Sequence, residues 1–395
     1  MIEVGTSEDS FSEERVTALI IGDLHFKETT YALGYELIGK IMKVAEEHNP
    51  TFIVILGDTL DKKSRADRPA FEQAEQIVAG LLEIAPVYLL IGNHDYDNDR
   101  QFLSEKHWFT SFKRWADPPI VVDRPIIKEY DDKTFVFCPY VPRGRFEEAL
   151  NTLIEDGEMW DMADTIFAHQ EFYGCDMNSV TSSKGDKWDE DYPPVISGHI
   201  HKGHTISPNI FYPGTPVQHT FGEKEDKYIW FVSWDEESLE SSVASPFFNV
   251  EKIDLGLRKK KELRLTVKEL EELNIEDYDN CHVKVKVSGS SEEFKKFRRG
   301  KMYKKLTSHG TKIEFLPSDD ISAGSGKRSK EQISFLEVLK EIVKKKTEPV
   351  QHMYEEITGD SLAESSVPGD ISEEEDVIIE LVFEAESSEI SEEEM

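Results

Sequence analysis

Five short segments combine carboxylates, histidines and one asparagine at spacings that suit metal-dependent chemistry. They are Asp23-Leu24-His25, Gly57-Asp58-Thr59-Leu60-Asp61, Gly92-Asn93-His94-Asp95, Ala168-His169-Gln170 and Gly198-His199-Ile200-His201. Such residues could hold two divalent cations, which lower the pKa of a bound water and neutralise charge developing on phosphate oxygens. One such segment alone is weak evidence for a metal site. All five in one chain predict a dinuclear centre that hydrolyses phosphoesters.

The residue types also suggest how the two ions would be shared. Asp58 follows an apolar run with a glycine before it, and we expect its carboxylate to bridge the ions. Asp23 and His25 are two residues apart, so on an extended backbone their side chains point to the same side. His199 and His201 have the same spacing and could serve two adjacent ions.

Three further residues complete this prediction. Asn93 offers a neutral amide oxygen, which would limit the total charge of the ligands. Imidazoles and hard oxygens without thiolates suit Mn, Fe or Zn and disfavour calcium or a structural zinc. Asp61 and Asp95 could each orient a histidine by accepting its second N–H, although Asp61 could equally cap the N-terminus of a helix.

The elements that must position these side chains are strands, because the first three segments each follow an apolar run. These runs are Ala18–Ile21, Phe52–Leu56 and Val87–Ile91. Helices are expected at Tyr31–His48, Pro69–Ile84, Gln101–Trp115 and Arg145–Ile154. Later strands are expected at Thr134–Cys138, Thr165–Ala168, Val195–Ser197, Asn209–Tyr212 and Lys227–Trp234. This order predicts an α/β fold, a sandwich of sheets flanked by helices, with polar loops at the strand ends.

The composition limits the class of protein. The 395 residues suffice for two or three domains, and a hydrophobic content of 38% predicts a mostly globular chain. No stretch approaches the roughly 20 apolar residues of a membrane span, and the start of the chain lacks the pattern of a signal peptide. An intracellular location is therefore expected, in the cytoplasm and nucleoid or in a nucleus. The three scattered cysteines suit reduced thiols better than disulfides.

The net charge of -33 is unevenly distributed. Residues 359–395 hold fourteen Asp/Glu and no Lys/Arg, whereas residues 252–312 hold seventeen Lys/Arg against ten Asp/Glu. Within this basic stretch, His282–Val287 alternates as a strand with one wet face, Glu292–Lys305 predicts a basic helix and Lys312–Leu316 a returning strand. An acidic metal-binding domain is thus followed by a basic α+β unit and an acidic tail.

The expected boundaries follow from these changes in composition. They are a flexible N-terminus (1–15), a metal-binding domain (16–245), a basic domain (250–317), a linker (318–329), a helical segment (330–358) and an acidic, mostly disordered tail (359–395). The helix at Lys330–Lys346 carries an apolar face with little local core to bury it.

The five segments together resemble the calcineurin-like metallophosphoesterase superfamily over residues 18–202. A narrower resemblance, to the SbcD-type nucleases of double-strand-break repair, is carried by Tyr212-Pro213-Gly214-Thr215-Pro216-Val217-Gln218 and Phe221-Gly222-Glu223. Past residue 250 only the architecture agrees. The resemblance implies a four-layer α/β/β/α metallophosphoesterase sandwich, a smaller α+β capping domain and a C-terminal partner-binding helix. It also implies a Mn-dependent DNA exonuclease or endonuclease that acts in repair and recombination.

The same resemblance implies roles for individual residues. One ion would be held by Asp23, His25, Asp58 and His201, and the other by Asp58, Asn93, His169 and His199. His94 would be the catalytic histidine that binds neither ion. The two ions would be Mn in the first place, with Mg, Fe or Zn as alternatives. The expected partners are DNA, a second copy of the chain and an SbcC-like ATPase of the SMC family, which would be held through the helix at 330–346.

DNA contacts are expected from the basic side chains of the capping domain. They are Arg258, Lys259, Lys260, Lys261, Lys295, Lys296, Arg298 and Arg299. Such contacts would be salt-dependent and insensitive to base sequence. The alternative for these residues is a solvated basic face without a ligand. The alternative for the helix at 330–346 is that it packs onto its own domain.

Two other functions remain open. A metallophosphatase or a small cyclic-nucleotide phosphodiesterase could use the same metal centre. The chain beyond residue 250 and the Pro-Gly-Thr-Pro segment at 213–216 favour a nuclease. A non-catalytic scaffold would need a broken motif, and none is broken. Among the remaining histidines, only His219 lies in a loop expected near the site.

Overall fold

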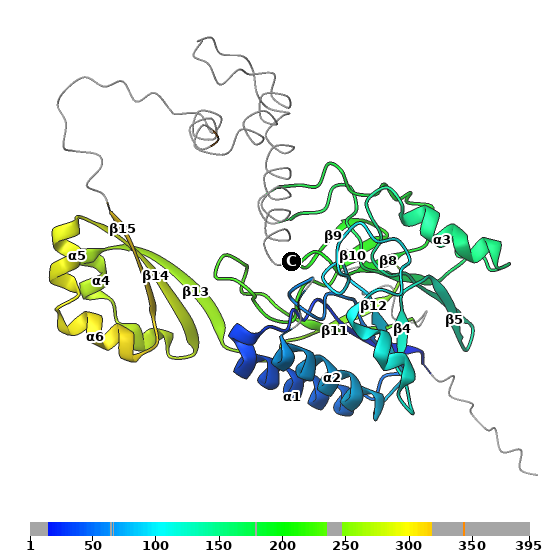
Figure 1. Cartoon of the computed structure of the whole chain (residues 1–395), viewed down its shortest axis with the longest axis horizontal. Coiled ribbons are helices and arrows are strands. Elements are labelled where there is room, and N and C mark those ends of the chain that lie inside the picture. The colour runs from blue at the N-terminus through cyan, green and yellow to red at the C-terminus, as the bar shows by residue number, and fades with distance from the viewer. Residues whose placement is uncertain are drawn as a thin grey trace, which may run out of the picture. The chain divides into compact units, whose positions relative to one another are not determined.

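The computed structural model describes residues 15–63, 65, 67–177, 180–234, 247–317 and 343 (Figure 1). In this part of the chain the strands form two six-stranded sheets and one three-stranded sheet. The predicted N-terminal segment, linker, tail and ATPase-binding helix lie outside the described residues, apart from Arg15 and Val343. None of the helices in the described ranges is long and apolar enough to cross a membrane.

The first sheet has the order β12-β11-β1-β2-β3-β4. Its four parallel strands are β1 (Thr17–Ile21), β2 (Phe52–Ile55), β3 (Val87–Leu90) and β4 (Ile120–Val122). The antiparallel strands β11 (Ile229–Ser233) and β12 (Asn249–Ile253) extend it at the other side of β1. Every residue of β1, β2 and β3 is buried, which explains their continuous apolar sequence.

The second sheet has the order β5-β6-β7-β8-β10-β9. Its strands are β5 (Ile126–Tyr130), β6 (Lys133–Phe137), β7 (Thr165–Ala168), β8 (Val195–Ser197), β10 (Ile210–Tyr212) and β9 (His204–Ser207). The four central strands pair in parallel, and the antiparallel strands β5 and β9 lie at the edges.

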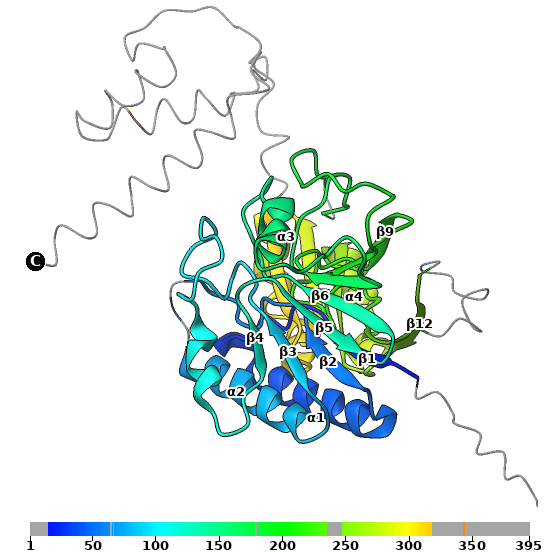
Figure 2. The same cartoon turned by 90° about the vertical axis from the view of Figure 1, so that its right-hand side faces the viewer.

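Helices complete the core on the outer faces of these sheets. α1 (Tyr31–His48), preceded by the 3₁₀ turn η1 (Glu28–Thr30), and α2 (Arg68–Leu82) lie side by side and share a core with the first sheet, whereas α3 (Phe146–Glu155) packs on the second (Figure 2). Their buried residues recur three or four positions apart, the period of an amphipathic helix.

Between the two sheets the core is strongly aromatic. The Phe52 ring lies 5.2 Å from Phe135 and 5.9 Å from Phe167, measured between centroids. Tyr88 stacks on Phe137 at 3.8 Å. These contacts join strands of both sheets in one cluster, so the edges that carry the polar loops are held together. The mixed α/β class is confirmed, and the finer four-layer assignment stays a prediction with which these clusters agree.

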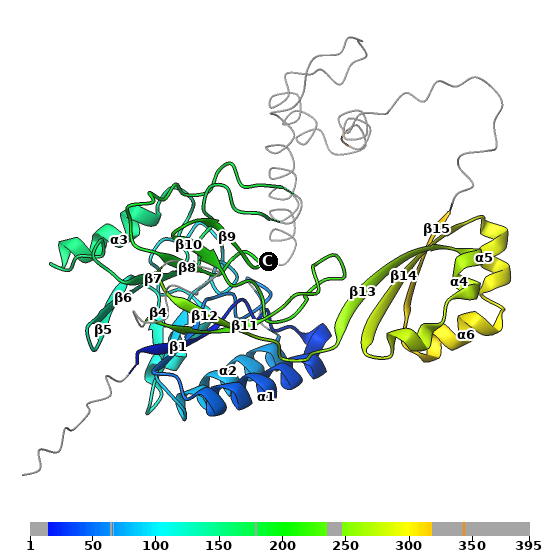
Figure 3. The same ribbon diagram turned by 180° about the vertical axis from the view of Figure 1, so that it is seen from behind.

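The third sheet is parallel, in the order β13 (Lys259–Thr266), β14 (Cys281–Gly289) and β15 (Lys312–Pro317). The helices α4 (Val267–Glu272), α5 (Ser291–Phe297) and α6 (Lys301–Ser308) line one of its faces (Figure 3), and the short 3₁₀ turn η4 (Ile275–Tyr278) precedes β14. On β14 the alternate residues Val283, Val285 and Val287 are buried under these helices, as the sequence pattern predicts.

Three expectations differ from the structure. The helix expected at Gln101–Trp115 is reduced to the 3₁₀ turn η2 (Trp108–Arg114), where the His107 side chain accepts from the Phe109 N–H and fixes a separate start. The helix expected at Glu292–Lys305 is two helices, because α5 ends at Phe297 and the extended Gly300 is the N-cap of α6, which begins at Lys301. β12 pairs with β11, so the first sheet continues past the expected boundary at residue 250.

Candidate metal centre

The five polar segments meet because the strands that precede them end side by side. β1, β2 and β3 are parallel neighbours in the first sheet, as β7 and β8 are in the second. The His25 N–H donates to the Asp58 carbonyl and the Gly198 N–H to the Ala168 carbonyl, both at 3.0 Å. His25, Asp58 and His199 have φ angles of 44°, 47° and 75°. These positive φ angles are strained for residues other than glycine. Strained backbone of this kind clusters at functional sites, where the surrounding structure holds it in place.

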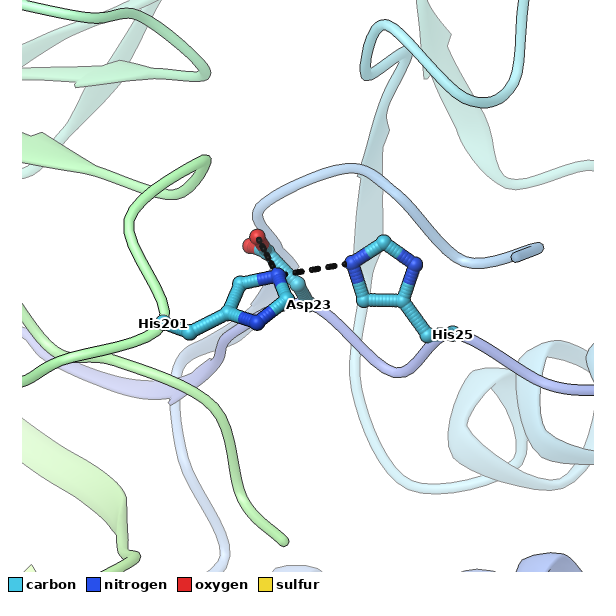
Figure 4. A group of neighbouring side chains, drawn as sticks. All are labelled: Asp23, His25 and His201. Carbon is cyan, nitrogen blue, oxygen red and sulfur yellow. Dashed lines mark hydrogen bonds and ion pairs between the residues drawn. The ribbon is translucent and has the colours of Figure 1, made fainter. Parts of the chain in front are cut away.

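A first group of possible ligands consists of Asp23, His25 and His201 (Figure 4). Their ligand atoms lie within 4.8 Å of one another. The Nε2 atoms of His25 and His201 are 3.0 Å apart, and His201 Nε2 lies 3.9 Å from Asp23 Oδ2. Asp23 Oδ2 is buried and has no hydrogen-bond partner among the described residues. A cation between these atoms would satisfy the orphaned oxygen and separate the two imidazole nitrogens.

A second group consists of Asp58, His169 and His199, and Asn93 lies against it. The Asn93 Oδ1 atom is 3.1 Å from His169 Nε2 and 2.9 Å from His199 Nδ1. Asp58 Oδ1 is 3.3 Å from His169 Nε2, whereas Asp58 Oδ2 is 3.7 Å from His25 Nε2 of the first group. The two oxygens of Asp58 therefore face different groups, which is the arrangement of a bridging carboxylate.

The seven predicted ligands thus converge in two adjacent groups that share Asp58. His169 Nδ1–H donates to the Leu56 carbonyl at 2.7 Å, which leaves the lone pair of Nε2 directed at the other ligands. Imidazole nitrogens with carboxylate and amide oxygens, and without sulfur, suit divalent transition metals. The residues present therefore fit a pair of divalent ions.

Burial and mutual attraction shift the pKa values of the predicted ligands away from their usual values. Burial raises the pKa of Asp23, and burial lowers the pKa of His25 well below its usual range. Burial also opposes the charged forms of Asp58 and His169, but their mutual attraction outweighs it, holding the pKa of Asp58 well below its usual value and raising that of His169 to about 9. Clusters of buried groups with such perturbed pKa values are typical of functional sites.

His94 belongs to neither group but lies beside both. Its backbone N–H donates to Asp58 Oδ1 at 2.8 Å, and its Nδ1–H donates to the Asp61 carbonyl at 2.5 Å. The ring meets that of His25 edge-on, with centroids 4.9 Å apart. Because Nδ1 is a donor, Nε2 is the nitrogen that can exchange a proton with a substrate.

Comparison with known proteins identifies the family. Residues 16–203 match the sequence profile of the family described as Calcineurin-like phosphoesterase. The chain is 38% identical to phosphoesterase 244L of Invertebrate iridescent virus 6, over 72% of this chain and 98% of that protein. It is 35% identical to phosphoesterase 078R of Invertebrate iridescent virus 3, over 84% of this chain and 93% of that protein. The chain belongs to the calcineurin-like phosphoesterase family. It is a metallophosphoesterase-type hydrolase, and this family uses divalent metals.

One match among solved structures is described as "GAP50 the anchor in the inner membrane complex of Plasmodium". It is 15% identical, covers 56% of this phosphoesterase and 81% of its own chain, and aligns with a TM-score of 0.36.

The two aspartates predicted to orient histidines differ in role. Asp61 Oδ1 lies 3.8 Å from His25 Nδ1 and 2.8 Å from Lys27 Nζ, and it does not cap α2, which begins at Arg68. The buried Asp95 carboxylate contacts backbone instead of a histidine, and burial raises its pKa to about 7. It accepts from the N–H groups of Gly92, Leu60 and Thr59 at 2.9, 3.2 and 3.4 Å.

Two glutamates that we did not predict as site residues face the paired histidines of the phosphoesterase. Glu171 Oε2 lies 3.9 Å from His199 Nε2, and Glu223 Oε1 lies 3.7 Å from His201 Nδ1. Each carboxylate faces the ring nitrogen that points away from the other predicted ligands. A carboxylate at this nitrogen can orient an imidazole that binds a metal through its other nitrogen. Glu171 follows His169 by two residues, which is the only local signal for it.

The loop after β10 brings a further histidine to the site. A Cβ on Gly22 would lie 1.9 Å from the Gly214 carbonyl, so the Pro-Gly-Thr-Pro segment can lie against the end of β1 only because residue 22 is glycine. Beyond this contact, His219 Nε2–H donates to the Asp23 carbonyl at 3.2 Å, and its ring lies 4.9 Å from that of His25. Burial lowers the pKa of His219 to about 3, so its imidazole is neutral.

The basic residues predicted to bind DNA have different surroundings in the phosphoesterase. The Arg258 guanidinium donates to the carbonyls of Asp279 and Cys281. Lys261 pairs with Glu225 at 3.5 Å, and Lys260 donates to the carbonyls of residues 218 and 219. Arg258 is exposed and Lys259 is half-buried. Lys295 and Lys296 in the last turn of α5 are also exposed, as are Arg298 and Arg299 after it. The Arg298 guanidinium lies 4.5 Å from the centre of the Phe315 ring.

Proposed function

We propose that this phosphoesterase is a Mn-dependent DNA nuclease, acting as an exonuclease or endonuclease in double-strand-break repair and recombination. The observation that carries the proposal is the contact between β13 of the basic unit and the loop of the metal centre. Lys260 N–H donates to Gln218 Oε1 at 2.6 Å, and the same loop carries His219 and Glu223. A unit with an excess of basic residues attached to the site suits a long polyanion better than a small phosphate ester.

The residues of the centre would share the work of hydrolysis. When bound, two divalent ions would activate a water and neutralise the phosphate in the transition state. Asp58 would contribute to holding both ions, because its two oxygens face the two groups of predicted ligands. His94 would donate a proton through Nε2 or stabilise charge beside the scissile phosphate, because the Asp61 carbonyl holds its Nδ1.

Cleavage of end-labelled linear and hairpin DNA in Mn²⁺ and in Mg²⁺, beside hydrolysis of a small aryl phosphodiester, tests this function. We expect DNA to be cleaved faster with Mn²⁺, and the His94→Ala variant to cleave both substrates about 10²–10⁴-fold more slowly. Turnover of the aryl ester with no cleavage of either DNA would refute the nuclease and favour a phosphatase or a cyclic-nucleotide phosphodiesterase.

The DNA contacts have a separate test. Reversing the charges of Arg298 and Arg299 should weaken duplex binding and lower the slope of its salt dependence by about 1 per lost phosphate contact. The aryl ester, which is too small to reach this surface, should be hydrolysed at the normal rate. Unchanged DNA cleavage across a salt series would refute the assignment.

We also propose an SbcC-like ATPase of the SMC family as the partner, bound through the helix expected at 330–346. The support is the apolar face of that sequence between a linker and an acidic tail. A chain truncated at residue 325 should lose binding to the ATPase and keep its hydrolysis of the aryl ester. Retained binding would contradict this role for the helix.

A further inference from the structure

We propose that Lys260 and Gln218 lock the loop that carries Glu223, and that Glu223 thereby orients His201 as a metal ligand. These three would be positioning residues, because none of them lies among the ligands. The inference rests on the proposed two-metal function, since it concerns the same centre.

The first part of the lock joins Gln218 to the backbone of β13. The side-chain amide of Gln218 pairs reciprocally with Lys260, accepting from its N–H at 2.6 Å and donating to its carbonyl at 3.1 Å. The same Nε2 atom also donates to the Glu223 carbonyl at 3.0 Å. Gln218 is only 4% exposed, so an unmade contact here would leave a buried polar group unsatisfied.

The second part is the ammonium group of Lys260. Its Nζ donates to the Gln218 carbonyl at 2.6 Å and to the His219 carbonyl at 3.0 Å. Burial lowers the pKa of this lysine, and the nearby Lys27 acts in the same direction. A half-buried ammonium with two backbone carbonyls holds the peptide between residues 218 and 219 against β13.

The locked loop reaches the metal ligand at both its side chain and its backbone. Glu223 Oε1 lies 3.7 Å from His201 Nδ1, and Glu223 Oε2 accepts from Lys227 Nζ at 2.8 Å. Lys227 Nζ also donates to the His201 carbonyl at 2.9 Å. Glu223 further accepts from the backbone N–H groups of His219 and Thr220, at 3.3 and 3.1 Å. The position of the carboxylate is therefore set by the loop that Lys260 and Gln218 hold.

The expected consequence is selective for one of the two ions. His201 belongs to the group with Asp23 and His25, whereas the second group has its own outer carboxylate, Glu171. Removing a carboxylate that orients a ligating imidazole typically costs about 10–100-fold in metal affinity. Removing the contacts of Lys260 or Gln218 should lower the affinity for the same ion by up to about tenfold. The effect is smaller because the Glu223 carboxylate remains but is less well placed.

The test is titration of Mn²⁺ into the chelator-treated full chain, followed by isothermal calorimetry, for the wild type and for single variants. Glu223→Gln and Lys260→Met should each lower the affinity for one of the two bound Mn²⁺ ions and leave the affinity for the other unchanged. Lys260→Arg, which keeps the charge and the donors, should restore most of the affinity. Lys224→Met is the matched control, because it removes an exposed lysine from the same loop and should change neither equivalent.

Thermal unfolding of each metal-free variant separates positioning from misfolding. Wild-type affinity in Lys260→Met, or equal weakening of both equivalents with a lowered Tm, would overturn the lock. A wild-type chain that binds two Mn²⁺ but cleaves no DNA would refute the nuclease function. The same variants would then still test the positioning role, because metal affinity is measured without DNA. A wild-type chain that binds no Mn²⁺ would overturn the metal centre and the lock together.

Discussion

Replacing Glu171 by glutamine should lower the affinity for one of the two metal ions. This is the ion that would be held by Asp58, Asn93, His169 and His199. The Glu171 carboxylate is 3% exposed and lies 3.9 Å from the outer nitrogen of His199. Glutamine keeps the shape of this side chain, so the substitution removes mainly the negative charge.

Two magnitudes follow from these contacts. Loss of an orienting carboxylate costs about 10–100-fold in metal affinity. Burial alone would raise the pKa of Glu171, but contacts with His199, Ser182 and Arg143 outweigh it and lower the pKa to about 2. A folded-state pKa below the unfolded value means that this contribution to stability is present above about pH 4.5 and is lost as the pH falls towards 2. At neutral pH it amounts to roughly 3 kcal/mol at most.

Calorimetric titration with Mn²⁺ and urea unfolding of the metal-free chain at pH 7 and pH 3 measure both effects. Glu148→Gln is the matched control, because Glu148 also receives two N–H groups from an arginine, Arg145, but is exposed on α3. The control should leave both ions unaffected. Wild-type affinity in Glu171→Gln, or an equal loss at both ions, would refute the reasoning, as would an acid dependence of unfolding that matches the wild type.

Three other perturbations have defined outcomes. His94→Ala should lower kcat by about 10²–10⁴-fold while leaving Mn²⁺ affinity unchanged, since His94 binds neither ion, and a comparable loss of affinity would make it a ligand instead. Removing metal with a chelator should lower Tm, and restoring Mn²⁺ at about 100 times Kd should stabilise the fold by about 2.7 kcal/mol, which a Tm independent of Mn²⁺ would contradict. Asp95→Asn should cost roughly 1–3 kcal/mol in urea unfolding, because the buried carboxylate accepts three backbone N–H groups, and an unchanged midpoint would contradict this role.

The predicted secondary structure is most accurate where the local pattern and the packing agree. α1 has the predicted bounds Tyr31–His48, because its apolar residues recur on one face that the first sheet buries. The prediction for Gln101–Trp115 was wrong over its first half, because a pattern of apolar residues cannot reveal that His107 caps a separate turn. The single helix expected across Gly300 was wrong because the pattern on either side continues through a residue whose backbone does not.

The sequence by itself determined the class of reaction, which is hydrolysis of a phosphoester. It could do so because the types of the predicted ligands and their positions after apolar strands are local properties. Asp23 and Asp58 could be placed at strand ends from the few residues that precede them. Only the tertiary structure decided which outer groups lie beside the predicted ligands, because these contacts join residues far apart in the chain. Glu171 meets His199 across two strands, and Lys260 meets Gln218 from another sheet, 42 residues away. No local pattern encodes such a pair, since it exists only once the sheets and the loop between them have packed.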